Sequence, residues 1–352
     1  ILAQAELGMP GNINFGSHPQ NAGETMALRL RGALFVLACG TTWGSEPTLR
    51  LRNGVEMPML AAGVWQYNDT EAEASLVAAF KAGFRMVDTA WDYHNQVGVG
   101  RALRASGLPR GALFVETKVP GCGLDPAVSR SNCFADTRRV LEGDLQQLNQ
   151  SYVDLVILHF PPREAFVLRS CHFSCGAVRD QWAALEEFYK AGKAKAIGVS
   201  NYCPSCFACL DGNATEVYPM VNQVSYHIGM GPDASGFFSF AQSKGVVLQA
   251  YSPLGNTPWT EKANPDILGG NLTSTLAAAH SVSTIQVALK WLVQHGLAAV
   301  TKSSNPQHLA ADIDLWSWNL TAAEMEVADN YRVFGMPSFA CNFADHAAEM
   351  LV

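Results

Sequence analysis

The chain has 352 residues, of which 48% are hydrophobic and 16% charged, the composition of a globular protein with a large core. Its net charge of −7 and the lack of a run of Lys and Arg argue against a nucleic-acid partner. No apolar run approaches the roughly 20 residues that span a bilayer, so we expect no membrane span.

The first 47 residues differ from the rest of the chain. Residues 1–25 show no clear hydrophobic period, and residues 26–40 read MALRLRGALFVLACG. Two arginines, an apolar run and small residues follow one another there, which is the order of a secretory signal peptide. A short core helix or strand is the alternative. We expect residues 1–47 to be an upstream segment with a signal peptide at 26–40, in a lumenal or secreted protein, with a cytoplasmic location as the alternative.

The cysteine pattern fits an oxidising compartment. Leaving out Cys39, an even set of eight cysteines permits disulfide bonds, although roughly a hundred pairings are possible. Zinc is the rival interpretation, because CPSCFAC has CxxC spacing, but no second pair of ligands accompanies it. We therefore expect disulfide bonds and no metal. Sequons for N-glycosylation occur at Asn68, Asn149, Asn213, Asn271 and Asn319.

A β-hairpin is expected after the upstream segment, where residues 48–60 alternate apolar and polar around Asn53-Gly54. Asn-Gly is the strongest short hairpin signal, because both residues tolerate the positive φ angles of a tight turn. The first helix should follow within residues 70–84, capped by Thr70 and ended by Gly83.

Eight apolar runs then alternate with helical patterns, at residues 58–66, 85–90, 113–119, 152–160, 194–201, 218–226, 246–253 and 297–303. Near-continuous apolar runs are typical of parallel strands that are covered on both faces. Eight strand–helix units in about 290 residues favour an α/β fold of the (β/α)₈ TIM-barrel type over an open sheet. No GxGxxG follows any run, which disfavours a Rossmann domain. We expect one barrel domain at 48–352, with an extra C-terminal helix and tail.

Polar side chains stand where several of these runs end. Asp88, with Tyr93 close behind it, follows the second run, whereas Lys118 ends the third and His159 the fourth. Each has an ordinary explanation, such as a solvated loop lysine or a satisfied core histidine. In a (β/α)₈ barrel, however, the carboxyl ends of the strands meet on one rim, where active sites are built. The four residues together therefore predict a catalytic group.

These side chains suit proton delivery to a carbonyl oxygen. A tyrosine hydroxyl titrates near 10, but an adjacent lysine ammonium favours the phenolate and should lower the pKa of Tyr93. Asp88 would hold Lys118 in place, and a neutral His159 would hold the carbonyl oxygen by a hydrogen bond. Such a proton donor needs a hydride donor opposite. Later strand ends offer a nicotinamide site, with Tyr251 for stacking, Ser200, Asn201 and Gln223 for the carboxamide, and Lys302 and Ser303 for a phosphate.

Seven segments in order make the chain resemble the aldo-keto reductases, from about residue 48 to 335. They are VDTAWDY, ETKV, LVILHFP, GVSNY, NQVSYH, AYSPLG and TKSSNP. The resemblance implies an NADPH-linked reductase (NADH being possible) of a small-molecule aldehyde or ketone, and we expect a monomer. It implies a tetrad of Asp88, Tyr93, Lys118 and His159, with Tyr93 as the proton donor. It assigns the nicotinamide to Ser200, Asn201, Gln223 and Tyr251, the 2′-phosphate to Lys302 and Ser303, and the substrate pocket to Trp65. We expect further cofactor contacts from Ser252, Leu254 and His308, and we expect Trp91 and Phe160 to line the pocket as well.

Two departures from the family pattern bear on function. Phe160 stands where the family usually has Trp, so we expect a reshaped pocket. His308 stands where an Arg usually grips the 2′-phosphate, and an imidazole supplies neither a permanent charge nor a bidentate fork. We therefore expect a weaker preference for NADPH over NADH than in the family. Substrate specificity should lie in residues 160–177, 255–272 and 332–352.

Two other functions are alternatives to a carbonyl reductase. The first is a non-catalytic, cofactor-binding barrel subunit of the same family, which a secretory location favours because reduced nicotinamides are scarce outside cells. The second is a (β/α)₈ glycosidase, which needs a pair of carboxylates at strand ends. Glu116 could share the face of Lys118, but no second carboxylate on the fourth or a later strand matches it.

Overall fold

The computed structural model describes residues 46–168, 170–212, 215–256 and 262–333. The signal peptide expected at 26–40 and nearly all of the expected tail lie outside these ranges, so both stay predictions. Cys39 and Cys341 lie outside them as well.

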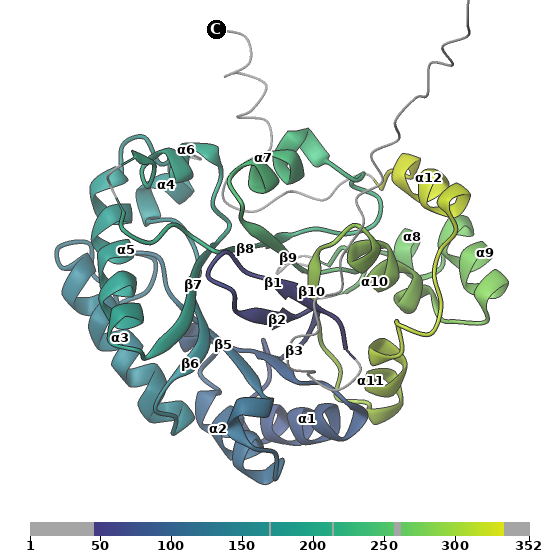
Figure 1. Cartoon of the computed structure of the whole chain (residues 1–352), viewed down its shortest axis with the longest axis horizontal. Helices are drawn as coiled ribbons and strands as arrows, with labels where there is room; N and C mark the ends of the chain where they lie inside the picture. The colour runs from purple at the N-terminus through teal and green to yellow at the C-terminus, as the bar shows by residue number, and fades with distance from the viewer. Residues whose placement is uncertain (1–45, 169, 213–214, 257–261, 334–352) are drawn as a thin grey trace, which may run out of the picture. The chain divides into compact units, whose positions relative to one another are not determined.

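Eight parallel strands form a closed barrel, which confirms the predicted (β/α)₈ fold. The strands pair in chain order, and β10 closes the barrel by pairing with β3 (Figure 1). Asp88, Ser200 and Tyr251 are the last residues of their strands, so their side chains stand on one rim. The strands are β3 (Leu60–Gly63), β4 (Met86–Asp88), β5 (Phe114–Val119), β6 (Val153–Leu158), β7 (Ala194–Ser200), β8 (Val221–Ser225), β9 (Val247–Tyr251) and β10 (Ala298–Thr301).

Helices surround the barrel as an outer layer (Figure 1). Three of them lie between β9 and β10, namely α8 (Pro265–Leu268), α9 (Asn271–His280) and α10 (Thr284–Gln294). The expected extra C-terminal helix is present as α12 (Ala322–Asn330). The other helices are α1 (Asp69–Ala82), α2 (Gln96–Ala105), α3 (Cys133–Leu148), α4 (Arg163–Leu168), α5 (Cys175–Lys190), α6 (Pro204–Ala208), α7 (Phe237–Ser243) and α11 (Pro306–Ile313).

The predicted hairpin is present and covers one end of the barrel. Its strands β1 (Thr48–Arg50) and β2 (Glu56–Pro58) pair antiparallel, and Gly54 in the turn has a φ of 87°. The Asn53 side chain donates to the main-chain oxygen of Lys195 at 2.8 Å. Lys195 stands at the amino end of β7, so the hairpin closes the end opposite to the rim that carries Asp88 and Ser200.

The start of α1 differs from the prediction by two residues. Its N-cap is Asn68, whose Oδ1 accepts hydrogen bonds from the main-chain nitrogens of Thr70 and Glu71, each at 3.0 Å. The Glu71 carboxylate accepts in return from the Asn68 nitrogen, which completes a capping box and leaves Thr70 inside the first turn. Gly83 ends the helix as predicted, with a φ of 120°.

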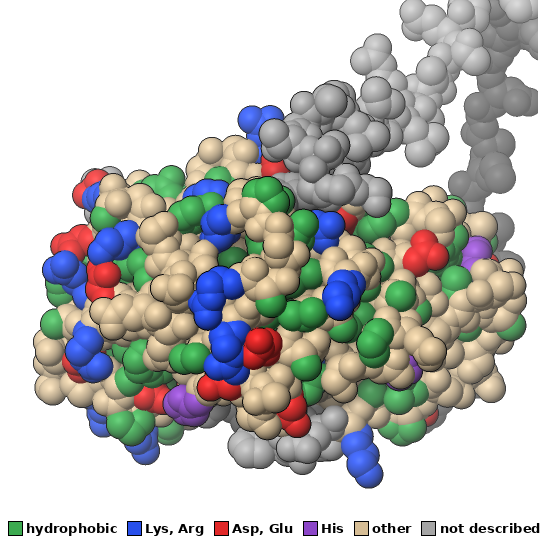
Figure 2. Space-filling view, turned by 90° about the horizontal axis from the view of Figure 1, so that it is seen from below, with side chains coloured by type: hydrophobic (Ala, Val, Ile, Leu, Met, Phe, Trp, Pro, Cys, Tyr) green, Lys and Arg blue, Asp and Glu red, His purple; other side chains and the backbone are tan. Residues whose placement is uncertain are grey.

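The strands are covered on both faces, which accounts for their continuous apolar sequences. Every residue of β6 is buried, and Trp182 of α5 and Trp291 of α10 belong to the same core cluster. On the face shown in Figure 2, acidic and basic side chains are interspersed. Among the described residues, no single helix is long and apolar enough to cross a membrane, although the bent pair Pro265–His280 and Thr284–Gln294 passes when taken together.

Candidate active site

A cavity of about 550 Å³ opens at the carboxyl ends of the barrel strands. Asp88, Tyr93 and His159 line it. Lys118, whose side chain is 0% exposed, contacts Asp88 and Tyr93 behind this wall. The structure thus brings the four predicted tetrad residues together at the rim where a (β/α)₈ barrel builds its site.

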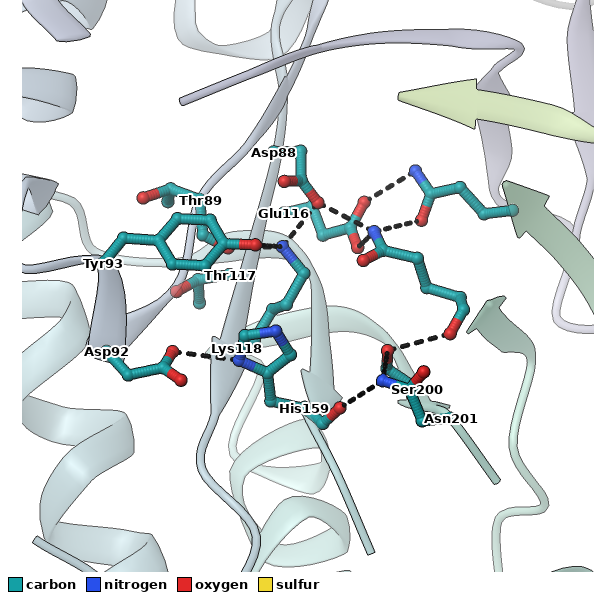
Figure 3. Close-up of polar contacts among 12 residues, drawn as sticks. Asp88, Thr89, Asp92, Tyr93, Glu116, Thr117, Lys118, His159, Ser200 and Asn201 are labelled. Atoms are coloured by element: carbon teal, nitrogen blue, oxygen red, sulfur yellow. Dashed lines mark hydrogen bonds and ion pairs between the residues drawn. The ribbon is translucent and has the colours of Figure 1, made fainter. Parts of the chain in front are cut away.

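The Lys118 ammonium links Asp88 and Tyr93 (Figure 3). Its Nζ lies 2.5 Å from Oδ2 of Asp88, 2.9 Å from the main-chain oxygen of Thr89 and 3.2 Å from Oη of Tyr93. An ammonium removed from water is costly unless it is paired and hydrogen-bonded, and these three oxygens meet that need. The ammonium therefore stands in a fixed position beside the phenol.

The pKa of Tyr93 runs against the sequence-based expectation. Burial, followed by the charges of Asp88, Asp92 and Glu116, raises the pKa of the phenol well above its usual value of 10.0. The expectation of a lowered pKa considered the adjacent ammonium alone. It left out the burial of the phenol and the three carboxyl groups. The phenol accordingly keeps its proton at neutral pH.

Asp92, which has no assigned task in the sequence, is the partner of His159. Its Oδ1 lies 2.9 Å from Nδ1 of the imidazole (Figure 3). Burial opposes ionisation of Asp92, but the charge and hydrogen bond of His159 outweigh it and hold the pKa of the carboxyl below its usual value. When Nδ1 donates to this carboxylate, a neutral ring has no proton on Nε2, and only the imidazolium can donate from both nitrogens.

A second polar cluster lies in the barrel interior beside the tetrad. Glu116 shares the interior face of β5 with Lys118, as the spacing predicts, and its carboxyl oxygens accept from Gln223 and Gln249, each at 2.9 Å. Burial and the charge of Asp88 raise the pKa of Glu116 to about 8, against the opposing effects of Lys118 and the Gln249 hydrogen bond. Sequence reasoning missed Gln249, although a glutamine inside the apolar strand VLQAY was a usable signal.

Two residues that line the cavity have a left-handed backbone conformation. Asn201 has a φ of 60° and Ser252 a φ of 50°, each directly after the last residue of its strand, and both line the cavity. Side-chain-bearing residues adopt this conformation rarely, and such strain gathers at functional sites. Asn201 accepts from Oη of Tyr251 at 2.8 Å and donates to the main-chain oxygen of His159 at 3.0 Å. It therefore ties together the ends of β6, β7 and β9.

The residues expected to seat a nicotinamide do not all face the cavity. Gln223, Tyr251 and Leu254 line it, together with Asn201 and Ser252. Ser200 does not line it among the described residues, because it is fully buried and its hydroxyl donates to the main-chain oxygen of Gln223 at 2.8 Å. Ser200 supports the wall from behind.

Of the three residues expected near the 2′-phosphate, one lines the described part of the cavity. Lys302 lines the cavity and donates to the main-chain oxygen of Trp65 at 2.9 Å and to Oε1 of Gln66 at 3.1 Å. Within the described part of the chain, Ser303 and His308 do not line it. Ser303 precedes α11 and His308 lies exposed on that helix. Lys302 is therefore the one residue of the three that lines the cavity in the described ranges.

Two of the three predicted substrate-pocket residues line the cavity, namely Trp65 and Phe160. Trp91 does not, because its ring packs on α3, where a Cβ added to Gly143 would come within 2.6 Å of the indole. Trp91 and Tyr93 are the ends of one 3₁₀ turn, and that turn directs the tyrosine to the cavity and the tryptophan to the helix layer. Trp91 is therefore a packing residue in this structure.

The loop after β5 contributes to the cavity. Leu124 and Asp125 of this loop line it. Cys122 and Cys133, at the two ends of the loop, lie at disulfide-bonding distance with Cα atoms 5.5 Å apart. Specificity was instead expected in later loops and the tail.

Two other cysteine pairs at bonding distance join the loops after β6 and β7. Cys171 pairs with Cys206 and Cys175 with Cys209, with Cα separations of 4.8 and 5.0 Å. Two cysteines of the CPSCFAC segment therefore face other cysteines and not a set of zinc ligands. No group of three or more His, Cys, Asp or Glu that could hold a metal occurs in the described ranges.

Comparison with known proteins agrees with the site. A profile of the Aldo/keto reductase family matches residues 57–332. The 9,11-endoperoxide prostaglandin H2 reductase of Trypanosoma cruzi is 33% identical over 292 residues, which cover 82% of this chain and 93% of that protein. The glyoxal reductase of Bacillus subtilis is 32% identical, with 81% and 92% covered.

Solved structures show the same relationship. MGS-M4, an aldo-keto reductase from a Medee basin deep-sea metagenome library, has a TM-score of 0.70 at 26% identity and covers 82% of this chain and 97% of its own. A variant of Gox0644 in complex with NADPH has a TM-score of 0.68 at 27% identity, with 82% and 95% covered. The chain belongs to the aldo/keto reductase family of oxidoreductases.

Proposed function

We propose that this protein reduces an aldehyde or ketone to an alcohol with NADPH, and that Tyr93 gives the proton. The observation that carries the proposal is the position of Lys118 Nζ, 2.5 Å from the Asp88 carboxylate and 3.2 Å from Tyr93 Oη, at the wall of the cavity. This contact polarises the phenol that faces a substrate. A small-molecule carbonyl compound is the substrate class, and the enzyme works as a monomer.

The residues around the cavity fit a nicotinamide, which supplies the hydride when it is bound. Gln223 presents an amide to the cavity, which suits a carboxamide, and Tyr251 presents a phenol ring. Lys302 lines the cavity, and together with Ser303 and His308 it would hold an adenosine 2′-phosphate. The NADPH complex of the related Gox0644 supports this cofactor.

Proton delivery follows from the pKa and the position of Tyr93. Its raised pKa keeps the phenol protonated at neutral pH, and the proton passes to the carbonyl oxygen as negative charge develops there. The Lys118 ammonium, 3.2 Å away, stabilises the phenolate that remains. Asp88 holds that ammonium in place.

His159 donates a hydrogen bond to the same carbonyl oxygen from Nε2. Its Nδ1 faces the Asp92 carboxylate at 2.9 Å, and this contact fixes the orientation of the ring. A charge-assisted hydrogen bond is stronger than a neutral one, so the contact favours the transition state, where the oxygen carries charge.

The 2′-phosphate is bound more weakly by His308 than it would be by an arginine, so NADH is used as well as NADPH. His308 is exposed on α11, and its imidazole cannot form a bidentate contact with a phosphate. Lys302 is the remaining cation of the proposed set, and its Nζ already donates to the loop after β3.

The substrate pocket is apolar and its walls are cross-linked. Trp65, Leu124 and Phe160 offer apolar surface to the part of the substrate beyond the carbonyl group. The loop that carries Leu124 is closed by the Cys122–Cys133 pair, which forms a disulfide bond in the lumenal or secreted protein. The predicted signal peptide and the sequons agree with that location.

Oxidation of NADPH over a panel of aldehydes and ketones tests the proposed reaction, with Tyr93→Phe as the control. Consumption of NADPH by the wild-type protein and its loss in Tyr93→Phe would support a reductase. Equal inactivity of both proteins, with NADPH still bound, would favour the alternative of a non-catalytic cofactor-binding subunit.

A further inference from the structure

Three buried side chains meet inside the barrel between the tetrad and the cofactor residues. They are Glu116 of β5, Gln223 of β8 and Gln249 of β9, from three different strands. Glu116 and Gln249 are 0% exposed, and neither lines the cavity formed by the described residues. Gln223 does line it, so the cluster reaches the cavity through this one amide.

The amide nitrogen of Gln223 faces three acceptors. Its Nε2 lies 2.7 Å from Oδ2 of Asp88, 2.9 Å from Oε1 of Glu116 and 2.9 Å from Oε1 of Gln249. Gln249 donates in turn from its own Nε2 to the second oxygen of Glu116 at 2.9 Å. An amide turned the other way would set its oxygen against Oδ2 of Asp88 and Oε1 of Gln249, which repel it. The Gln223 nitrogen is therefore held inward.

The Gln223 oxygen is consequently presented outward. None of the described residues donates a hydrogen bond to Oε1, and the side chain lines the cavity. A glutamine side chain in water rotates between its two amide orientations, so it offers a donor or an acceptor equally well. Here the surrounding acceptors allow one orientation of the Gln223 amide, in which its oxygen faces the cavity as an acceptor.

We infer that Glu116 and Gln249 are positioning residues that fix the Gln223 amide so that its oxygen accepts an N–H of the nicotinamide carboxamide. The inference rests on the proposed function, which supplies the cofactor. The interior of a (β/α)₈ barrel is ordinarily filled with branched aliphatic side chains, which carry no desolvation cost. A carboxyl and an amide at these two positions are explained by the orientation that they impose on Gln223.

Two substitutions remove one acceptor each and keep the side-chain size, namely Glu116→Met and Gln249→Met. The matched control is Gln96→Met. Gln96 is also a fully buried glutamine, but it donates to Oγ1 of Thr117 at 2.6 Å, on the opposite face of β5 from Glu116. The three variants therefore share the loss of a buried polar group, and two of them alter the surroundings of Gln223.

The readout is the ratio of two dissociation constants, for NADP⁺ and for its 3-acetylpyridine analogue. The analogue keeps the carbonyl oxygen of the carboxamide and lacks its N–H groups. We expect the wild-type protein to prefer NADP⁺ about tenfold, which corresponds to about 1.4 kcal/mol for one hydrogen bond. The ratio should fall to about twofold in Glu116→Met and Gln249→Met, and stay about tenfold in Gln96→Met. General destabilisation would weaken both ligands alike and leave the ratio unchanged.

Either of the two positioning variants is sufficient if the other does not fold. A ratio that stays at the wild-type value in a folded positioning variant overturns the inference and leaves the proposed function standing, since NADP⁺ still binds. Equal affinity of the wild-type protein for the two dinucleotides also overturns it. Failure of the wild-type protein to bind either dinucleotide overturns both.

Discussion

The Nδ1 atom of His159 lies 2.9 Å from Oδ1 of Asp92, although the two residues are separated by 67 positions in the chain. Lys118 contributes a further favourable charge to this carboxylate. The pair therefore fixes the orientation of an imidazole ring that lines the cavity together with Tyr93.

Asp92→Asn should lower kcat/KM for aldehyde reduction about tenfold. An asparagine keeps a polar contact to Nδ1 but removes the carboxylate charge, so the hydrogen bond that orients the imidazole becomes a neutral and weaker one. Measurement of kcat/KM at neutral pH checks this point, and equal values for the variant and the wild-type protein would show that the pair has no catalytic effect.

Glu116→Gln should change the pH dependence of stability. The folded chain holds the Glu116 proton up to about pH 8, whereas a free glutamate releases it near 4.5, so the wild-type free energy of unfolding falls as pH rises between these values. The slope is at most about 1.4 kcal/mol per pH unit. Relative to wild type, the variant should therefore gain stability from pH 5 to pH 8.

Urea unfolding of both proteins at pH 5, 6.5 and 8 measures this difference. Glu326→Gln, on the exposed surface of α12, controls for the loss of one carboxyl group. If the difference between Glu116→Gln and wild type were constant over this range, the buried carboxyl would not be the group that titrates.

His308→Arg should raise the preference for NADPH. An arginine at this exposed position of α11 adds a permanent charge and a fork that matches a phosphate. The ratio of the dissociation constants for NADH and NADPH should be below about a thousand in the wild-type protein, roughly 4 kcal/mol, and should rise about tenfold in the variant. A wild-type ratio above a thousand would contradict the expected weak preference for NADPH over NADH.

The cysteine pairs predict a low thiol content. A thiol titration of the denatured, unreduced mature protein should find at most two free thiols among the eight cysteines after Cys39, because three pairs lie at bonding distance. A count of eight would end the disulfide proposal. The double variant Cys122→Ser/Cys133→Ser should raise KM for the carbonyl substrate severalfold and leave the dissociation constant for NADPH unchanged, because Leu124 lies in the loop that this pair closes.

The barrel, the hairpin and the tetrad are predictable from the sequence because each depends on local order. Continuous apolar runs alternate with helical patterns, Asn53 and Gly54 mark the turn, and a parallel barrel brings consecutive strand ends to one rim. The positions of Asp88, Lys118 and His159 follow from where their strands end.

The partners of these residues depend on contacts that the sequence does not show. Asp92 meets a residue 67 positions away, and Gln249 meets Glu116 across 133 positions, so neither role can be read from spacing. The direction of Trp91 depends on one short turn, and the pKa of Tyr93 on burial and three carboxyl groups from different segments. The order of the strands in the sequence predicts which residues share the rim, whereas the hydrogen-bond network beneath the rim depends on contacts that form in the folded structure.

The rate of NADPH oxidation by Tyr93→Phe, with an aldehyde that the wild-type protein reduces, tests the central claim most directly. Loss of a general acid costs about a hundredfold to ten-thousandfold, so we predict a fall in kcat of at least about a hundredfold. The dissociation constant for NADPH should change by less than about twofold, since the phenylalanine keeps the ring. A variant that keeps kcat within about threefold of wild type would contradict Tyr93 as the proton donor.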